Sequence, residues 1–96
     1  MKRDEITEIL VRFKQLNQTK YDIIKIGLFG SAAKGDLKPG SDIDVVVMLG
    51  KQDLFNLIGI KQDLEEQLSS VVDIISYRER MNPFLKSRID KEALYV

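Results

Sequence analysis

Three short apolar runs interrupt the otherwise mixed sequence, and each predicts a buried β-strand. The runs are Ile23–Phe29, Val45–Leu49 and Val71–Ile75, and all three are rich in β-branched residues. Only Asp73 breaks the apolar character of the third run. Residues 94–96 form a further short apolar segment, which we expect to pack back on the sheet.

Apolar residues at helical spacing occupy the stretches between these runs. The stretch from about residue 3 to 17 carries such a stripe, made of Ile6, Ile9, Leu10, Phe13 and Leu16. A second stretch, from about 53 to 68, carries Leu54, Leu57, Ile58, Leu64 and Leu68 on one side. Asn82-Pro83 predicts the start of a final helix through about Ala93, because Asn favours the N-cap and Pro the first turn.

The segment between the first two strands carries the candidate chemistry. Gly30-Ser31 opens a short turn of helix-compatible residues, which Gly35 closes. At the start of such a turn, backbone N–H groups and the positive end of the helix dipole are available to phosphate oxygens. Glycine lets a phosphate approach the backbone closely, and the Ser31 hydroxyl adds a donor. The turn therefore predicts a phosphate-binding site, with an ordinary structural turn as the alternative.

Two carboxylates open the second strand. Asp42 and Asp44 are two residues apart, so on a strand they project to the same side, about 6.6 Å apart. Adjacent carboxylates repel each other, and a cation between them relieves that repulsion. Oxygen ligands of this kind suit Mg²⁺ or Mn²⁺. The pair therefore predicts a divalent metal site.

A site shared by the turn and the carboxylates would constrain the sheet. Gly30 follows the first strand and Asp42 precedes the second, so these strands must be antiparallel if the two halves meet. The helix between the second and third strands is long enough for a right-handed parallel crossover, which would place Asp73 beside the aspartate pair. We therefore expect an α+β (mixed α/β) fold in the order α-β-α-β-α-β-α. Its mixed sheet would have three or more strands, with the helices gathered on one face.

Asp73 is isolated among apolar neighbours, where a carboxylate without a partner is costly to bury. It could face water from an edge strand, or it could pair with Arg78 or Arg80. For the residue taken alone, these structural explanations are favoured. With a carboxylate pair alongside, a third metal ligand or a general base becomes the better explanation.

Composition narrows the possible chemistry. A chain of 96 residues predicts one domain, spanning 1–96. Its 15 basic and 15 acidic residues leave no positive excess, so we do not expect direct nucleic-acid binding. Cysteine and histidine are absent, which excludes a thiolate nucleophile and a His-ligated zinc site and leaves carboxylates as candidate bases. No membrane-spanning run or signal peptide is seen, so we expect a cytoplasmic protein without a membrane partner.

Taken together, these residues resemble the active-site pattern of the DNA polymerase β-type nucleotidyltransferase superfamily. The pattern is formed by Gly30-Ser31, Gly35, Ser41-Asp42-Ile43-Asp44 and the later Asp73. The small size, the helix before the first strand and the Leu94-Tyr95 ending are similar to the minimal nucleotidyltransferase (MNT) family, over essentially the whole chain. The resemblance implies a nucleotidyltransferase fold and transfer of AMP from ATP to an acceptor, with release of pyrophosphate.

The resemblance also implies a role for each matching residue. Asp42, Asp44 and Asp73 would be catalytic and would hold two Mg²⁺ ions, or Mn²⁺, which in two-metal sites lie about 3.5–4 Å apart. Asp73 would in addition act as the base for an acceptor hydroxyl. The residues implied in nucleotide binding are Gly30, Ser31, Lys34, Gly35 and Ser41, with Gly30 and Ser31 at the β- and γ-phosphates.

One departure from the family pattern concerns the short turn. Many members have arginine at the positions of Ala32 and Lys34. Lys34 can neutralise phosphate charge, but it lacks the bidentate fork of arginine, and Ala32 contributes no charge. The departure points to weaker triphosphate binding or no turnover, but Ser31, Asp42, Asp44 and Asp73 are all present, so an active enzyme is the expectation.

The family resemblance also implies a partner. MNT proteins commonly accompany a HEPN-domain protein in toxin–antitoxin pairs, where the MNT protein adds AMP to a HEPN RNase toxin. A catalytically weak protein that blocks its HEPN partner by contact is the second hypothesis, and an uncommitted nucleotide-binding domain is the third. Larger relatives carry a second domain that shapes the nucleotide or acceptor site. Here the corresponding side of the site could be formed by the partner or by a second copy of the chain.

Overall fold

A four-stranded sheet in the order β3-β2-β1-β4 lies at the centre of the computed structural model, which describes residues 1–96. The strands are β1 (Ile23–Phe29), β2 (Ile43–Leu49), β3 (Val72–Ser76) and β4 (Leu94–Tyr95). The helices are α1 (Arg3–Tyr21), α2 (Gly30–Lys34), α3 (Leu54–Leu68) and α4 (Pro83–Glu92). The predicted α+β class and the predicted order of elements are confirmed, with β4 added at the end.

The strand directions match the expectation from the sequence. β1 and β2 are antiparallel, and β2 and β3 are parallel, with α3 as the crossover between them. β4 is antiparallel to β1 and makes the C-terminal segment the second edge of the sheet. The N–H of Val96 donates to the carbonyl of Ile26 at 3.0 Å and continues this pairing. The apolar end of the chain therefore does pack back on the sheet.

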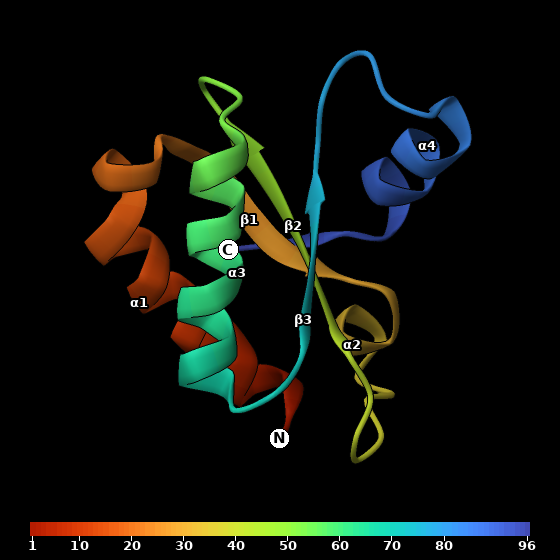
Figure 1. Ribbon diagram of the computed structural model, residues 1–96. Helices are drawn as coiled ribbons and strands as arrows, with labels where there is room; N and C mark the ends of the chain where they lie inside the picture. Colours follow the sequence, from red (N-terminus) through yellow and green to blue (C-terminus); the bar gives the residue numbers. More distant parts are fainter.

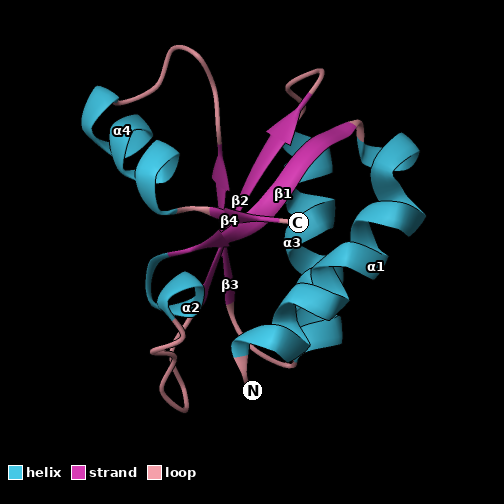
Figure 2. Cartoon of the chain, turned by 180° about the vertical axis from the view of Figure 1, so that it is seen from behind, coloured by secondary structure: helices cyan, strands magenta, loops and turns pink.

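The helices cover both faces of the sheet, so the expectation that they gather on one face is wrong. α1 and α3 lie together on one side, and α4 lies on the other (Figures 1 and 2). The cause is the apolar run in β2, because Val45 and Val47 belong to the core under α1 and α3, whereas Val46 packs with Ile89 of α4. All three valines are fully buried. A central strand that is apolar on both sides requires a covering layer on each side.

The first helix extends beyond its predicted end near residue 17, to Tyr21. Its cap, Asp22, has a left-handed backbone conformation, and the Asp22 N–H points back to the carbonyls of Gln18 and Thr19. Tyr21 stacks on Phe13 and donates a hydrogen bond of 2.6 Å to Asp63 of α3. This tertiary contact explains why the polar residues before Tyr21 are helical rather than a connecting loop.

Several apolar residues expected on buried helix faces are instead exposed. Leu16, Leu54 and Ile58 expose 80%, 69% and 43% of their surface. The buried face of α3 is formed by Ile60, Leu64 and Leu68. No helix combines the length and the apolar character that crossing a membrane requires.

Candidate active site

The turn after β1 is built so that Gly30 can lie against a carboxylate. Gly30 has a φ of +62°, which glycine adopts at little cost, and it begins α2. A Cβ atom placed on Gly30 would lie 2.6 Å from Oδ2 of Asp44. The turn and the acidic start of β2 are therefore in direct contact. Gly35, with a φ of +78°, closes the turn in a left-handed cap.

Strand pairing gathers the acidic residues. On β2, Asp44 lies opposite Phe29 of β1 on one side and opposite Asp73 of β3 on the other. Asp42 comes two residues before Asp44, at the entry to the strand. By the alternation of side chains along β2, Asp44 faces the side of the sheet that carries α4, because Ile43 is buried in the core on the other side.

Asp73 is exposed and lies on β3, an edge strand of the sheet. The ion pairs of the chain are Lys61–Glu65 and Arg88–Glu92, so Asp73 has no ion pair with Arg78 or Arg80. The explanation of Asp73 as a buried partner of an arginine is therefore wrong. Its exposure agrees with the water-facing alternative, which does not account for its place opposite Asp44.

The electrostatic state of Asp44 reflects this crowding. Burial raises the pKa of the Asp44 carboxyl, and the charges of Asp73 and then Asp42 raise it further, together with a hydrogen bond to Asp73. Desolvation and like charge both disfavour the ionised form. A cation placed here would oppose both effects.

The carboxylates of Asp42 and Asp44 fit a Mg²⁺ ion that is bound jointly by the protein and by a substrate. No three His, Cys, Asp or Glu side chains lie close enough together to hold a metal ion by themselves. Mg²⁺ does not need such a cage, because it is usually held by one or two carboxylates together with water and substrate phosphates. Asp42 and Asp44 can supply those carboxylates, and Gly30 leaves open backbone beside Asp44. The ligand role of Asp73 stays a prediction.

The other predicted nucleotide-binding residues lie around α2 and the loop that follows it. Ser31 is half-buried in the first turn of α2, and Lys34 is exposed in its last turn. Ser41 is half-buried just before Asp42, and its N–H donates to the carbonyl of Lys38 at 3.0 Å. Ala32 is 1% exposed and belongs to the core under α1 and α3, so this position contributes packing rather than charge.

Two arginines near the turn are not singled out by the sequence. Arg3 of α1 donates through Nη1 to the carbonyl of Ala33 at 3.1 Å, across 30 positions of sequence. The guanidinium carbon of Arg88, on α4, lies 5.3 Å from the ring centre of Phe29, the residue before Gly30. No local motif predicts these contacts, because they depend on how α1 and α4 dock on the sheet. They bring positive charge near a turn whose position 32 is the uncharged Ala32.

We expect Asp73→Asn to stabilise the metal-free protein at neutral pH. A carboxyl pKa that is raised in the folded state means that stability falls as the pH rises through the titration of Asp44. Removing the charge of Asp73 lessens that loss, by up to about 1 kcal/mol because solvent screens the pair, or about 4–8 °C in melting temperature. The gain should disappear in acid, below the ordinary carboxyl pKa, where Asp44 is protonated in both proteins.

Thermal melts with a chelator present, from acid to neutral pH, measure this effect. Asp36→Asn, which removes an exposed loop carboxylate, is the matched control. A lower melting temperature for Asp73→Asn at neutral pH would contradict the crowding of the three carboxylates. If Asp73 is also the base of the reaction, the same variant should lose transfer activity while remaining folded.

Comparison with known sequences connects this geometry to a family. Residues 11–96 match a family described as polymerase beta, nucleotidyltransferase. A Methanocaldococcus jannaschii protein assigned by name to the protein adenylyltransferases is 33% identical over 93 residues, which cover 96% of this chain and 95% of that protein. The protein adenylyltransferase MntA of Thermococcus cleftensis is 33% identical over 92 residues, covering 95% of this chain and 88% of MntA.

Comparison with solved structures gives the same fold. A structure described as a minimal nucleotidyltransferase has a TM-score of 0.83 and 26% identity, and the match covers 98% of this chain and 95% of that one. A toxin–antitoxin structure with AMP-PNP has a TM-score of 0.74 and 24% identity, covering 90% and 68%. A complex of tri-AMPylated Shewanella oneidensis HEPN toxin with MNT antitoxin has a TM-score of 0.71 and 20% identity, covering 97% and 70%. At these identities the last two comparisons show a shared fold.

Proposed function

The chain belongs to the polymerase β nucleotidyltransferase family, and from this premise we propose that it transfers AMP from ATP to a hydroxyl group of a HEPN-domain protein. The reaction would depend on Mg²⁺ bound at Asp42 and Asp44. In a toxin–antitoxin pair, such a transfer would inactivate the HEPN protein and make this chain the antitoxin.

One observation carries the proposal most directly. Gly30, at the start of the turn, lies against the carboxylate of Asp44, and Asp44 lies opposite Asp73 in the sheet. A phosphate at the turn would therefore be next to the acidic pair, and an acceptor at the sheet edge would be next to Asp73. Nucleotidyl transfer requires this juxtaposition of triphosphate, cation and acceptor.

Each residue would act on a different part of the reaction. The backbone at Gly30 and the Ser31 hydroxyl would bind the β- and γ-phosphates, and Lys34 would offset their charge. Bound Mg²⁺ would neutralise charge that develops on the phosphates. Asp73 would accept the proton of the acceptor hydroxyl, whose oxygen bonds to the α-phosphorus as pyrophosphate leaves. The exposed position of Asp73 on an edge strand gives a protein acceptor access to it.

The relatives support a protein as the acceptor. MntA of Thermococcus cleftensis is named a protein adenylyltransferase, and it matches this chain along nearly its whole length. The chain also shares its fold with a chain in the structure of an MNT antitoxin bound to an AMPylated HEPN toxin. A HEPN-domain protein is therefore the partner that we propose to test.

Contact-only inhibition of the partner is the second candidate function. Ala32 is buried and uncharged, so the turn holds one positive charge fewer than the family pattern provides, and Lys34 lacks the bidentate fork of the second arginine. A protein with a weakened triphosphate site could still bind and block a HEPN partner. The acidic residues Asp42, Asp44 and Asp73 are all retained, and this favours the enzymatic proposal.

A transfer assay with two labels separates the candidates. The chain is incubated with a purified HEPN-domain partner, Mg²⁺ and ATP labelled either at the α- or at the γ-phosphate. Adenylyl transfer should label the partner from α-labelled ATP and not from γ-labelled ATP, and a chelator should prevent it. Phosphoryl transfer would give the opposite labelling, and inhibition without any label would support contact alone.

We expect Ser31→Ala to weaken ATP binding by about 5- to 30-fold. The change removes one hydrogen bond to a charged phosphate, which contributes about 1–2 kcal/mol. Calorimetry with ATP and Mg²⁺ measures the affinity, and Ser69→Ala, at the far end of α3, is the control. Equal ATP affinity of wild type and Ser31→Ala would leave only a structural role for the hydroxyl.

A further inference from the structure

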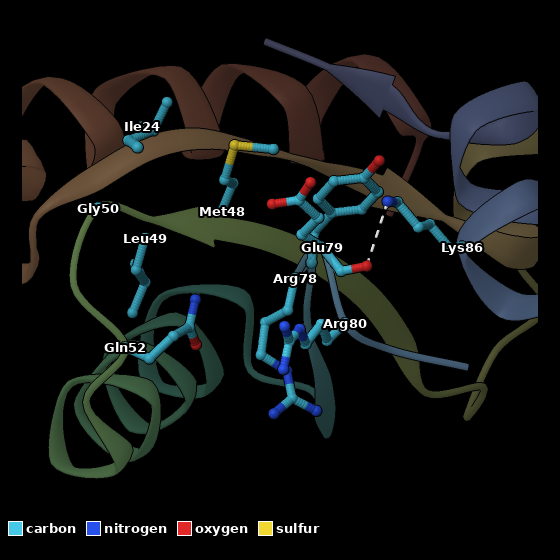
Figure 3. Close-up of a pocket in the computed structure, with 10 residues that line it drawn as sticks. Ile24, Met48, Leu49, Gly50, Gln52, Arg78, Glu79, Arg80 and Lys86 are labelled. Carbon is cyan, nitrogen blue, oxygen red and sulfur yellow. Dashed lines mark hydrogen bonds between the residues drawn. The ribbon is translucent and has the colours of Figure 1, made fainter. Parts of the chain in front are cut away.

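A groove of about 580 Å³ is lined in part by Ile24, at the start of β1, and Met48, near the end of β2 (Figure 3). It therefore lies at the end of the sheet opposite to the candidate active site, which follows β1 and precedes β2. Ile24 and Met48 contribute apolar surface to it, and Arg78, Arg80 and Lys86 contribute positive charge. We call this the basic groove. In Figure 1 the loop before α4, which carries its arginines, is at the top of the sheet, whereas α2 is at the bottom.

Hydrogen bonds fix the backbone of the loop that carries the two arginines. The N–H of Tyr77 donates to the carbonyl of Val47 at 2.7 Å, and the Tyr77 hydroxyl donates to Asp90 at 2.8 Å. Lys86 donates through Nζ to the carbonyl of Glu79 at 3.3 Å, a contact drawn in Figure 3. The loop is therefore held at several points, and its charged groups are presented from a fixed backbone.

The positive charges of the basic groove have no acidic partner within the chain. Neither ion pair of the protein involves Arg78, Arg80 or Lys86. Among the ten residues that line the groove, Glu79 is the only acid, whereas the chain as a whole has no net charge. The basic groove is thus a local concentration of positive charge on a chain that is neutral as a whole. Unpaired, exposed arginines beside apolar surface are typical of a protein interface.

We propose that the basic groove binds an acidic segment of the acceptor protein. The proposal rests on the proposed function, since it supplies the recognition of the protein that is adenylylated. Carboxylates of such a segment would pair with Arg78 and Arg80, whose forked guanidinium groups bind carboxylates through two hydrogen bonds. Apolar side chains between those carboxylates would cover Ile24, which is 49% exposed, and Met48.

Features of the basic groove favour a protein over a nucleic acid. The groove offers no free aromatic face on which a base could stack, because Tyr77 has Lys86 over its ring at 5.7 Å and its hydroxyl is bound to Asp90. The exposed apolar surface of Ile24 and Met48 suits the apolar side chains of a protein.

The position of the basic groove suits a partner that reaches the active site. Met48 and Asp44 are four residues apart on β2, so they lie on the same face of the sheet and about 13 Å apart. α4 covers the part of that face between them, where Val46 packs with Ile89. A partner that lies across α4 could place an acidic segment in the groove and its hydroxyl at Asp73.

Fluorescence anisotropy with defined probes tests the proposal without ATP or metal. The probes are a labelled peptide of alternating Glu and Leu, the same peptide with Gln for Glu, and an oligouridylate of equal charge. The proteins are the full chain, the variant Arg78→Glu/Arg80→Glu, and the control Arg12→Glu/Lys20→Glu, which changes two exposed cations on α1. Asp42→Asn/Asp44→Asn is included, so that a failure of the groove is distinguishable from a failure of the catalytic proposal.

We expect the wild type, the α1 control and the aspartate variant to bind the acidic peptide with similar affinity. Arg78→Glu/Arg80→Glu should bind it at least about tenfold more weakly, because two favourable contacts become repulsive. The Gln peptide and the oligouridylate should bind more weakly than the acidic peptide. Equal loss in the α1 control, no loss in the groove variant, or tighter binding of the oligouridylate would each overturn the proposal.

Discussion

The double variant Asp42→Asn/Asp44→Asn should lose nucleotidyl transfer by at least about a thousandfold. Asp42 and Asp44 are the carboxylates that we propose as metal ligands, and a bound metal ion contributes several kcal/mol to transition-state stabilisation. Asparagine has nearly the same shape as aspartate but carries no charge. The fold should therefore be kept, and the repulsion among the carboxylates at positions 42, 44 and 73 should be relieved.

Transfer rates with Mg²⁺, together with circular dichroism of the same samples, measure this loss. The matched control is Asp36→Asn/Glu66→Gln, which removes two exposed negative charges elsewhere on the chain. The control should transfer AMP at the wild-type rate. Undiminished transfer by the Asp42→Asn/Asp44→Asn variant would refute the metal assignment.

Gly30→Ala should reduce ATP binding by at least about tenfold and should also lower stability. The added methyl group would lie 2.6 Å from Oδ2 of Asp44, so the carboxylate or the turn must move. The positive φ of Gly30 adds a strain of about 1–2 kcal/mol for any residue with a Cβ atom. Both effects act where we place the phosphates.

Gly40→Ala is the control for backbone strain. Gly40 also has a positive φ, of +82°, but a Cβ atom placed there meets nothing within 4 Å. Both variants should lose stability through strain, as measured by urea unfolding, whereas only Gly30→Ala should lose ATP affinity, as measured by calorimetry. Equal ATP affinity of the two variants would show that Gly30 does not contribute to phosphate binding.

The sheet could be predicted from the sequence because its strands are encoded locally. The bounds predicted for Ile23–Phe29 are those of the structure. The antiparallel pairing follows from a site shared by Gly30 and Asp42, and the parallel pairing follows from the length of the helix between the second and third strands. The contact between Gly30 and Asp44 is the physical result of that topology. The roles of these residues in catalysis remain predictions.

Features that depend on docking between distant segments could not be read from local patterns. The apolar run Val45–Leu49 indicates a strand buried on both faces, but it does not show that α4 is the segment that covers the second face. The extension of α1 depends on the hydrogen bond from Tyr21 to Asp63. The contact of Arg88 with Phe29 likewise depends on where α4 lies.

The reversibility of toxin neutralisation tests the central claim most directly. A HEPN-domain RNase is incubated with this chain, ATP and Mg²⁺, and is then separated from the chain. Its intact mass and its RNase activity are measured, with Asp42→Asn/Asp44→Asn in a parallel incubation. Covalent transfer predicts that the RNase treated with the wild type gains the mass of adenylyl groups and stays inactive after separation. An RNase of unchanged mass that regains its activity once the chain is removed would contradict the account.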